Sequence, residues 1–275
     1  MFRLSRYRFL RQVLVGVLSF TCVVVFAACG SAPTSESSSG AGGEVLRVAT
    51  EPAFPPFESQ AANGDLEGFS IELMNAIGEA IGTPVEFESL PFDGIIPALQ
   101  AGTVDAAISS MTITAERAQT VSFSRPYFKA GLAIAVPAND TGTTSLASLQ
   151  GKRIAVQIGT TGAEEAQKVQ GAQIRTFDSA PLALQELSNG NVDAVINDAP
   201  VTQYAIKSGN IPGVKVASGE LLTEEFYGIA TPKDSPTVEQ INAGLKTVLE
   251  NGKYAEIYDK WFGGEPPNLP ETAPI

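Results

Sequence analysis

A twelve-residue pattern that occurs twice in the chain constrains its fold more than any other feature. The first copy, LQAGTVDAAISS, covers residues 99–110, and the second, LSNGNVDAVIND, covers residues 187–198. Each copy has the pattern of an apolar helix end, a glycine-containing turn and a short buried strand that stops at two polar residues. In open α/β sheets, the groups just beyond the carboxyl ends of strands are those that contact ligands. The repeat therefore predicts two α/β lobes whose polar strand ends, Ser109-Ser110 and Asn197-Asp198, face one ligand cleft.

The first 28 residues are predicted to be a secretory leader rather than part of the fold. Arginines at the start precede an almost wholly apolar run over residues 13–28, which is too short for a comfortable membrane span. Small residues then lead directly to Cys29, a pattern similar to the bacterial lipobox, whose cysteine is lipidated and becomes the mature N-terminus. The alternative is an ordinary signal peptide in which Cys29 is incidental.

Residues 29–43 consist almost entirely of Gly, Ser, Ala, Pro and Thr. This composition cannot bury a core and is typical of a flexible tether. The leader, the cysteine and the tether together predict an exported protein, on the outer face of the cell membrane or in the periplasm. Its contact with the membrane is expected to be through the lipid anchor alone.

Charge and composition exclude several functions. Removal of residues 1–28 takes away four arginines and no acid, so the formal charge changes from −12 to −16. A chain this acidic is not expected to bind nucleic acid or a membrane surface. The absence of histidine removes the Ser-His-Asp triad and the commonest metal ligand. We therefore expect no metal site. We also predict no cofactor and no catalytic residue, and we expect a monomer.

Beyond residue 44, strands alternate with helices, which is typical of mainly parallel sheets. In the first lobe we predict a helix capped by Ser70 and a second helix over residues 92–99. Strands of the two lobes are predicted over residues 45–49, 85–89, 104–108, 152–156, 174–177 and 192–196. This order of elements predicts an α/β fold.

Two stretches, residues 127–135 and 225–230, are predicted to cross between the lobes, and each contains a glycine that would suit a hinge. A helical pair over residues 237–262 is expected to return to the first lobe. The expected domains are residues 44–131 plus 228–265 for lobe 1, residues 132–227 for lobe 2, and a tail over residues 266–275.

Arg117 is the strongest single indication of a ligand. Thr114 is expected to cap a helix and to place Arg117 in its first turn, where a cation opposes the helix dipole unless an anion binds in front of it. A guanidinium is also the side chain best shaped for a carboxylate. The alternative is an arginine that pairs with Glu116 or another neighbour on the surface.

Groups in the second half of the chain could complete the site. Gly159, Thr160 and Thr161 lie between a strand and a helix, where free N–H groups attract anions. Asp198 ends an apolar strand, and a buried carboxylate there requires a cation such as an α-ammonium group. The alternative role for Asp198 is to cap the helix that begins at Ala199.

The remaining candidates are aromatic, acidic and hydroxyl side chains at strand ends. These candidates are Glu51, Phe54, Phe92, Ser109, Ser110 and Thr112. The two phenylalanines could equally belong to the core. An arginine and N–H groups for a carboxylate, an aspartate for an ammonium group, and aromatic walls together would suit a free amino acid.

With these residues in place, the chain resembles the polar amino-acid-binding proteins of ABC importers, which have the two-lobed type II periplasmic binding-protein fold. The resemblance covers residues 45–262. Its motifs are ATEPAFPPF at 49–57, FDGIIPAL at 92–99, SSMTITAER at 109–117, GTT at 159–161, VDAVIND at 192–198 and GKYAEIYDKWF at 252–262. It implies a protein that captures a free L-amino acid and presents it to the permease subunits of an ABC transporter.

The resemblance also implies a role for each site residue. Arg117 would bind the α-carboxylate with N–H groups of Thr112 and Thr161, and Asp198 with the Ser110 carbonyl would bind the α-ammonium group. The ligand would lie between Phe54 and Phe92, and Glu51 would contact its side chain.

The motifs leave the ligand open between glutamine and the basic amino acids. Gln157 and Asn197 stand where a glutamine binder would carry Lys and His, although the motif at residues 92–99 is similar to those proteins. Ser109 and Ser110, in contrast, resemble the basic-amino-acid binders.

Two other classes of function are open to this fold. One is an enzyme similar to cyclohexadienyl dehydratase, for which Glu51 and Asp198 would be the only obvious acid–base groups. The other is an amino-acid sensor subunit that signals to a receptor. We predict a binding protein for transport and not an enzyme.

Overall fold

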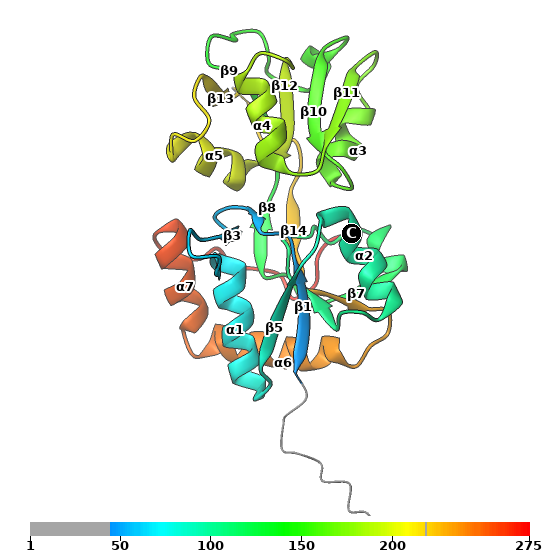
Figure 1. Ribbon diagram of the computed structural model, residues 1–275, viewed down its shortest axis with the longest axis vertical. Helices are drawn as coiled ribbons and strands as arrows, with labels where there is room; N and C mark the ends of the chain where they lie inside the picture. The colour runs from blue at the N-terminus through cyan, green and yellow to red at the C-terminus, as the bar shows by residue number, and fades with distance from the viewer. Residues whose placement is uncertain (1–44, 218) are drawn as a thin grey trace, which may run out of the picture. The chain divides into compact units, whose positions relative to one another are not determined.

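The computed structural model describes residues 45–217 and 219–275, which belong to one compact unit (Figure 1). The predicted leader, the tether and Cys29 lie outside these residues. The chain forms two five-stranded sheets with helices against them, which confirms the predicted two-lobed α/β class. Within the described residues, no helix has the length and apolar character needed to cross a membrane.

Lobe 1 is built on the sheet β5-β1-β6-β15-β7. Its strands β1, β5 and β6 are parallel, and β15 is antiparallel to β6 and β7. The strands are β1 (Leu46–Thr50), β5 (Val85–Ser89), β6 (Ala106–Ala107), β7 (Val121–Phe123) and β15 (Ala230–Pro232). The helices are α1 (Phe69–Ile81), α2 (Phe92–Ala101), α6 (Thr237–Glu250) and α7 (Lys253–Phe262). As predicted, the helical pair α6 and α7 returns to lobe 1 and packs against α1.

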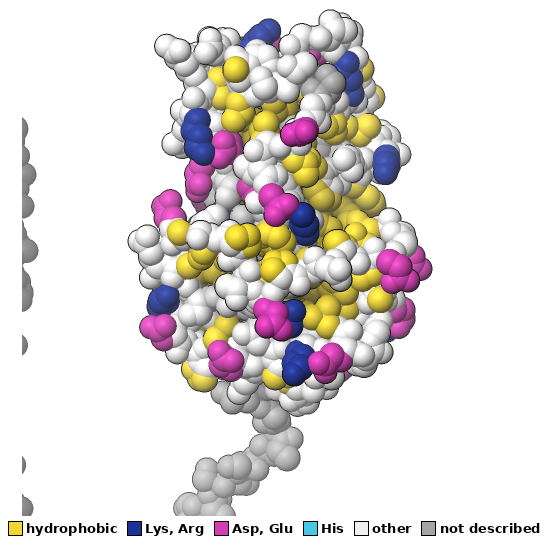
Figure 2. Space-filling view, turned by 180° about the vertical axis from the view of Figure 1, so that it is seen from behind, with side chains coloured by type: hydrophobic (Ala, Val, Ile, Leu, Met, Phe, Trp, Pro, Cys, Tyr) yellow, Lys and Arg dark blue, Asp and Glu magenta, His cyan; other side chains and the backbone are white. Residues whose placement is uncertain are grey.

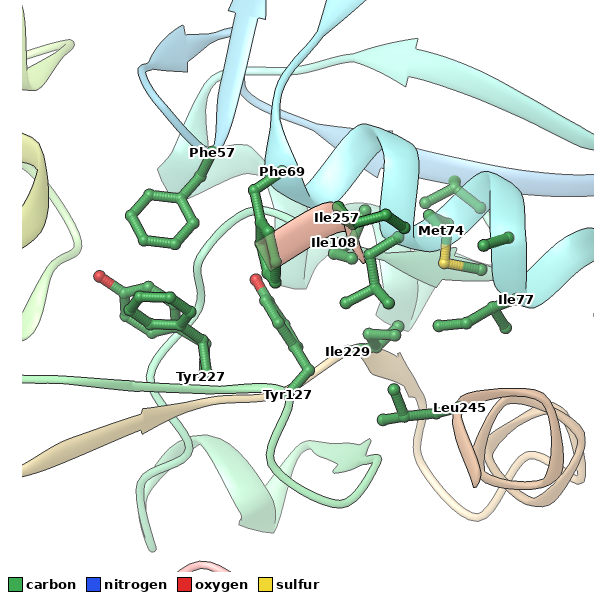
Figure 3. Packing of buried hydrophobic residues seen from close by; sticks show 14 of the residues in the cluster. Phe57, Phe69, Met74, Ile77, Ile108, Tyr127, Tyr227, Ile229, Leu245 and Ile257 are labelled. Atoms are coloured by element: carbon green, nitrogen blue, oxygen red, sulfur yellow. The ribbon is translucent and has the colours of Figure 1, made fainter. Parts of the chain in front are cut away.

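The core of lobe 1 contains a cluster of packed aromatic rings. The rings of Phe57 and Tyr227 lie 5.4 Å apart, and those of Phe69 and Tyr127 lie 6.5 Å apart (Figure 3). All four side chains are fully buried. Because aromatic rings bury large areas in fixed orientations, this cluster rigidly supports the residues at the lobe boundary.

Lobe 2 is built on the sheet β11-β10-β12-β9-β13. Strands β10, β11 and β12 are parallel, whereas β9 is antiparallel to both of its neighbours. The strands are β9 (Leu132–Pro137), β10 (Arg153–Gln157), β11 (Gln173–Phe177), β12 (Ala194–Asp198) and β13 (Val214–Val216). The helices are α3 (Thr161–Gln167), α4 (Ala180–Ser188) and α5 (Ala199–Lys207), with a 3-10 turn η2 (Leu146–Leu149).

Two antiparallel strands, β8 (Phe128–Ala130) and β14 (Glu225–Tyr227), run between the sheets where the crossings were predicted (Figure 1). The glycines of the crossings are required for space. A Cβ on Gly131 would lie 2.3 Å from the Thr223 carbonyl oxygen, and one on Gly228 would lie 2.7 Å from the Ile113 side chain. The neighbouring segments therefore lie too close to Gly131 and Gly228 for either position to carry a side chain. The domain boundaries themselves stay a prediction.

The entry to α1 differs from the prediction. A small sheet of β2 (Ala53–Phe54), β3 (Glu58–Gln60) and β4 (Leu66–Glu67) precedes the helix, with the turn between β3 and β4 around Gly64. The N-cap is Gly68, not Ser70, because Gly68 has φ 134° and a Cβ there would lie 2.0 Å from the Phe57 carbonyl oxygen. Ser70 lies inside the first turn and is fully buried.

The predicted strand over residues 104–108 is also shorter than expected, because only Ala106 and Ala107 pair as β6.

On the described part of the face in Figure 2, acidic and basic side chains are scattered without a continuous basic stripe.

Candidate functional site

A small cavity lies between the two lobes, at the polar strand ends that the repeat predicts. Lobe 1 lines it with Glu51, Phe54, Phe92, Ser109, Ser110, Thr112 and Arg117, and lobe 2 with Gln157, Thr160, Thr161 and Asp198. The structure thus brings ten of the twelve candidate residues together. Gly159 and Asn197 are not in the lining, and Gln157 is an additional member.

Arg117 is buried in the cavity wall, with 8% of its surface exposed. Its Nη1 donates to the Thr112 carbonyl oxygen at 2.8 Å, and its Nη2 donates across the lobes to the Gly159 carbonyl oxygen at 2.9 Å. Its guanidinium carbon lies 5.4 Å from the centre of the Phe92 ring. No carboxylate among the described residues forms a salt bridge with it, so the surface pair with Glu116 is wrong.

Burial lowers the pKa of Arg117, because the charged form loses hydration. Thr114 does accept a hydrogen bond from the Arg117 N–H at 3.2 Å, as a cap would. However, the element that follows is the 3-10 turn η1 (Arg117–Gln119), which has Glu116 and not Thr114 at its N-cap position and is too short to carry the expected helix dipole. What calls for an anion at Arg117 is its unpaired, buried charge.

Asp198 is the last residue of β12 and stands at the N-cap position of α5, but its side chain makes no capping hydrogen bond. Its carboxylate instead accepts a short hydrogen bond from the Tyr227 hydroxyl. The pKa of Asp198 is raised to about 7, first by burial and then by the negative charge of Glu225, although Tyr227 and Arg117 act in the opposite direction. The capping alternative is therefore wrong, and the carboxylate faces the cavity.

Glu51 follows β1 and is tied to both lobes. Its N–H donates to Ser109 Oγ at 3.0 Å, and its carboxylate accepts from Gln157 Nε2 at 2.8 Å. Burial raises the pKa of Glu51 to about 7, and the hydrogen bond from Gln157 only partly opposes this shift. Gln157 ends β10, so the rule that ligands meet strand ends could have identified it from the sequence.

Ser110 is held in an uncommon backbone conformation, with φ 49°. Its N–H donates to the Tyr127 hydroxyl at 3.1 Å, and its hydroxyl lies 3.0 Å from both carboxylate oxygens of Glu58. Glu58 is fully buried, and this burial raises its pKa well above its usual range. Glu58 and Tyr127, which sequence reasoning missed, therefore hold this strand end in place.

The remaining candidates have structural partners. Thr160 caps α3, because its Oγ1 accepts from the Ala163 N–H at 3.2 Å. Gly159 offers Arg117 a carbonyl oxygen, whereas an N–H group for an anion was expected. Asn197 Nδ2 donates to Thr202 Oγ1 at 3.2 Å. Asn197 and Asp198 are consecutive on β12, and consecutive strand side chains face opposite sides of a sheet, so only one can enter the cavity.

The cavity thus contains one guanidinium and two carboxylates. No group of three or more acids or cysteines among the described residues is arranged to hold a metal ion. Two α/β lobes that close on a small, buried, charged cavity define the class as a two-lobed binding protein for a small polar solute.

The chain belongs to the bacterial extracellular solute-binding proteins, family 3, whose family model matches residues 46–264. It is 35% identical to a probable histidine-binding protein of Neisseria gonorrhoeae over 88% of this chain and 92% of that protein. Among solved structures, it is similar to an ancestral arginine-binding protein bound to arginine (TM-score 0.76, 44% identity, 80% of this chain and 98% of the other).

The chain is also similar to an ancestral arginine-binding protein bound to glutamine (TM-score 0.75, 45% identity, again 80% of this chain and 98% of the other). The family predicted from the sequence is therefore confirmed. These relatives are named as binding proteins, which supports the prediction that the chain is not an enzyme.

Proposed function

We propose that the protein captures a free L-amino acid with a cationic side chain, arginine above the others, in the cavity between its lobes. In this proposal the α-carboxylate lies against Arg117, the α-ammonium group lies against Asp198, and the side chain extends toward Glu51. The protein then presents the amino acid to the permease subunits of an ABC transporter. The names of the relatives, which refer to histidine and arginine, support this assignment.

The observation that carries the proposal is the second carboxylate of the cavity. The two charges of an amino acid's backbone match Arg117 and Asp198. Glu51 is then left over, with 5% of its surface exposed and only the neutral amide of Gln157 bonded to its carboxylate. A buried carboxylate is costly unless a cation accompanies it, so a guanidinium or ammonium side chain is the best complement.

Glutamine is the competing ligand. Its neutral side-chain amide can hydrogen-bond to Glu51 and Gln157, but it leaves the Glu51 charge unmatched. The structure solved with glutamine belongs to a relative that is named for arginine, which is consistent with glutamine as a weaker second ligand. We therefore rank arginine, lysine and histidine above glutamine.

Isothermal titration calorimetry with arginine, lysine, histidine and glutamine tests the proposal. Arginine is expected to bind most tightly. Glu51→Gln should weaken arginine binding by about tenfold or more, because a charge-assisted contact is lost, and should change glutamine binding much less. Glu67→Gln removes an exposed acid from β4 of the same lobe and is the matched control.

Two results would contradict the assignment. One is wild-type protein that binds glutamine more tightly than any basic amino acid. The other is a Glu51→Gln variant whose preference for arginine over glutamine is unchanged, because Glu51 would then not be the group that reads the side chain.

We further propose that Cys29 carries a lipid and that residues 29–43 tether the lobes to the outer face of the membrane. The lipobox-like sequence before Cys29 supports this part of the proposal. Growth of the producing cells with a labelled fatty acid should label the wild-type protein and leave Cys29→Ser unlabelled. Equal labelling of the two proteins would reject the lipid anchor.

A further inference from the structure

Glu225, the first residue of β14, is a buried acid that the ligand-binding proposal does not use. It has 7% of its surface exposed and does not line the cavity, but it lies directly behind two residues that do. Its Oε2 accepts hydrogen bonds from Thr112 Oγ1 at 2.7 Å and from Thr161 Oγ1 at 3.1 Å. Its Oε1 accepts from Thr223 Oγ1 at 3.1 Å.

The three hydroxyl groups come from three different parts of the protein. Thr112 follows β6 in lobe 1 and forms an isolated β-bridge with Tyr227 of β14. Thr161 is the first residue of α3 in lobe 2. Thr223 belongs to the segment that leads into β14. One carboxylate oxygen on a crossing strand therefore bonds both lobes at once.

This arrangement fixes what the two threonines can offer a ligand. A threonine hydroxyl has one proton, and in Thr112 and Thr161 that proton points to Glu225. Neither hydroxyl can donate to a bound carboxylate, so the donors left on these residues are their backbone N–H groups. Thr112 also holds Arg117 through its carbonyl oxygen, so Glu225 positions the side of the cavity where the α-carboxylate is proposed to lie.

The arrangement also depends on closure. Thr112 and Thr161 lie on opposite lobes, and any opening of the cleft moves them apart. Glu225 can then keep at most one of its two interlobe partners. Hydrogen bonds to a charged acceptor are stronger than those to a neutral acceptor. Because opening of the cleft breaks at least one of them, they stabilise the closed state relative to the open one.

We propose that Glu225 is a positioning residue that latches the closed state, by bonding Thr112 of lobe 1 and Thr161 of lobe 2 through a single carboxylate oxygen. The inference rests on the proposed function only in that closure traps the ligand. It predicts that Glu225 controls how long a bound amino acid stays, without touching it.

The first test measures ligand dissociation from purified protein by stopped-flow displacement, using arginine as the probe. Glu225→Ala should raise the dissociation rate about tenfold or more and change the association rate much less, since related variants of one site differ mainly in dissociation. Glu225→Gln keeps an acceptor oxygen and should restore most of the slow dissociation. Glu224→Gln is the matched control, because Glu224 is 60% exposed and pairs only with Lys129.

A double-mutant cycle separates the latch from general damage to the fold. Thr161→Val should reproduce part of the effect, and the double variant Glu225→Ala/Thr161→Val should dissociate no faster than Glu225→Ala alone. Two results would overturn the proposal. One is a double variant in which the effects of the two substitutions on the dissociation rate multiply, as independent effects do. The other is a Glu225→Ala dissociation rate within twofold of wild type.

Small-angle X-ray scattering of the ligand-free proteins provides a readout that needs no ligand. Glu225→Ala should have a larger radius of gyration than wild type and Glu224→Gln, with an unchanged circular dichroism spectrum. Equal radii together with equal dissociation rates reject the latch. If wild type binds no amino acid, the proposed function fails while the scattering comparison still decides the role of Glu225.

Discussion

Arg117 is held by two backbone carbonyl oxygens and one aromatic ring, and it has no acidic partner among the described residues. A buried guanidinium in this situation is unfavourable in the empty protein and becomes favourable when an anion binds. The residue therefore trades some stability of the ligand-free state for ligand affinity. This trade is typical of binding sites.

We predict that Arg117→Ala weakens amino-acid binding by several kcal/mol, which corresponds to about a thousandfold, because the ligand carboxylate would be buried without a partner. Arg117→Lys should recover only part of the loss, since an ammonium group lacks the bidentate fork. Calorimetry measures both variants. Arg175→Ala, which removes an exposed arginine from β11 of lobe 2, is the control.

Thermal unfolding of the ligand-free proteins completes the comparison. The Arg117→Ala protein should unfold within a few degrees of wild type, because the loss of two hydrogen bonds is offset by removal of a buried charge. An affinity for arginine within threefold of wild type would show that Arg117 does not bind the carboxylate.

At the residue scale, the sequence could predict the groups at strand ends but not their partners. Asp198 and Glu51 were found because strand ends meet ligands in α/β folds, and Arg117 because a guanidinium in the first turn of an expected helix calls for an anion. Tyr227 and Glu58 were missed, because each contacts its partner only through the tertiary arrangement of the chain. Asn197 was a different error, since strand alternation already excludes it from the face that Asp198 occupies.

At the scale of elements, the repeat has a structural meaning of its own. In the first copy, Asp105 accepts from the backbone N–H of Arg47 at 3.0 Å and from its Nη2 at 2.8 Å. In the second copy, Asp193 accepts from the N–H of Arg153 at 2.8 Å and from its Nη2 at 2.7 Å. Each aspartate thus connects the start of the repeat strand to the neighbouring parallel strand of its own lobe, β1 in lobe 1 and β10 in lobe 2.

The bonded arginine lowers the pKa of both aspartates. These pairs are about one-third to one-half exposed, so they fix strand register rather than supply much stability.

The helices were predicted well because their apolar faces repeat at helical spacing. The helix start at Gly68 could not be predicted, because a close approach to Phe57 decides it.

We predict that Gly68→Ala lowers the free energy of unfolding by about 3 kcal/mol or more, because it adds both backbone strain and a steric clash. Gly64→Ala separates the two effects. Gly64 also has a positive φ, 91°, but a Cβ there meets nothing within 4 Å. Its substitution should cost about 1 kcal/mol. Urea unfolding curves measure both, and equal losses would contradict the steric explanation.

At the scale of the whole molecule, the two lobes were predictable and their closed contact was not. Alternating strands and helices, the repeat and the two crossings together define the lobes. The contacts that close the cavity, Arg117 to Gly159 and Glu51 to Gln157, join residues of different lobes. No local pattern encodes such pairs, because they depend on how the crossing strands orient one lobe against the other.

Closure also places two acids with raised pKa values in one cavity. The pKa of Glu51 and that of Asp198 are each raised to about 7, mainly by burial. A carboxyl whose folded-state pKa is raised contributes stability that is full below its unfolded pKa of about 4 and is lost as the pH rises through about 7. The empty closed protein is therefore most stable when both acids are protonated, while a cationic ligand requires both to be ionised.

We therefore predict that arginine binding strengthens as the pH rises from about 5.5 to 8, with release of up to two protons per ligand at the acidic end. Calorimetry in buffers of different ionisation enthalpy measures this number. Glutamine binding should release at most the one proton of Asp198, because its side chain does not require Glu51 to ionise. Glu51→Gln should reduce the number of protons released on arginine binding to the number released on glutamine binding. Arginine affinity that is constant over this pH range would mean that neither acid faces a ligand cation.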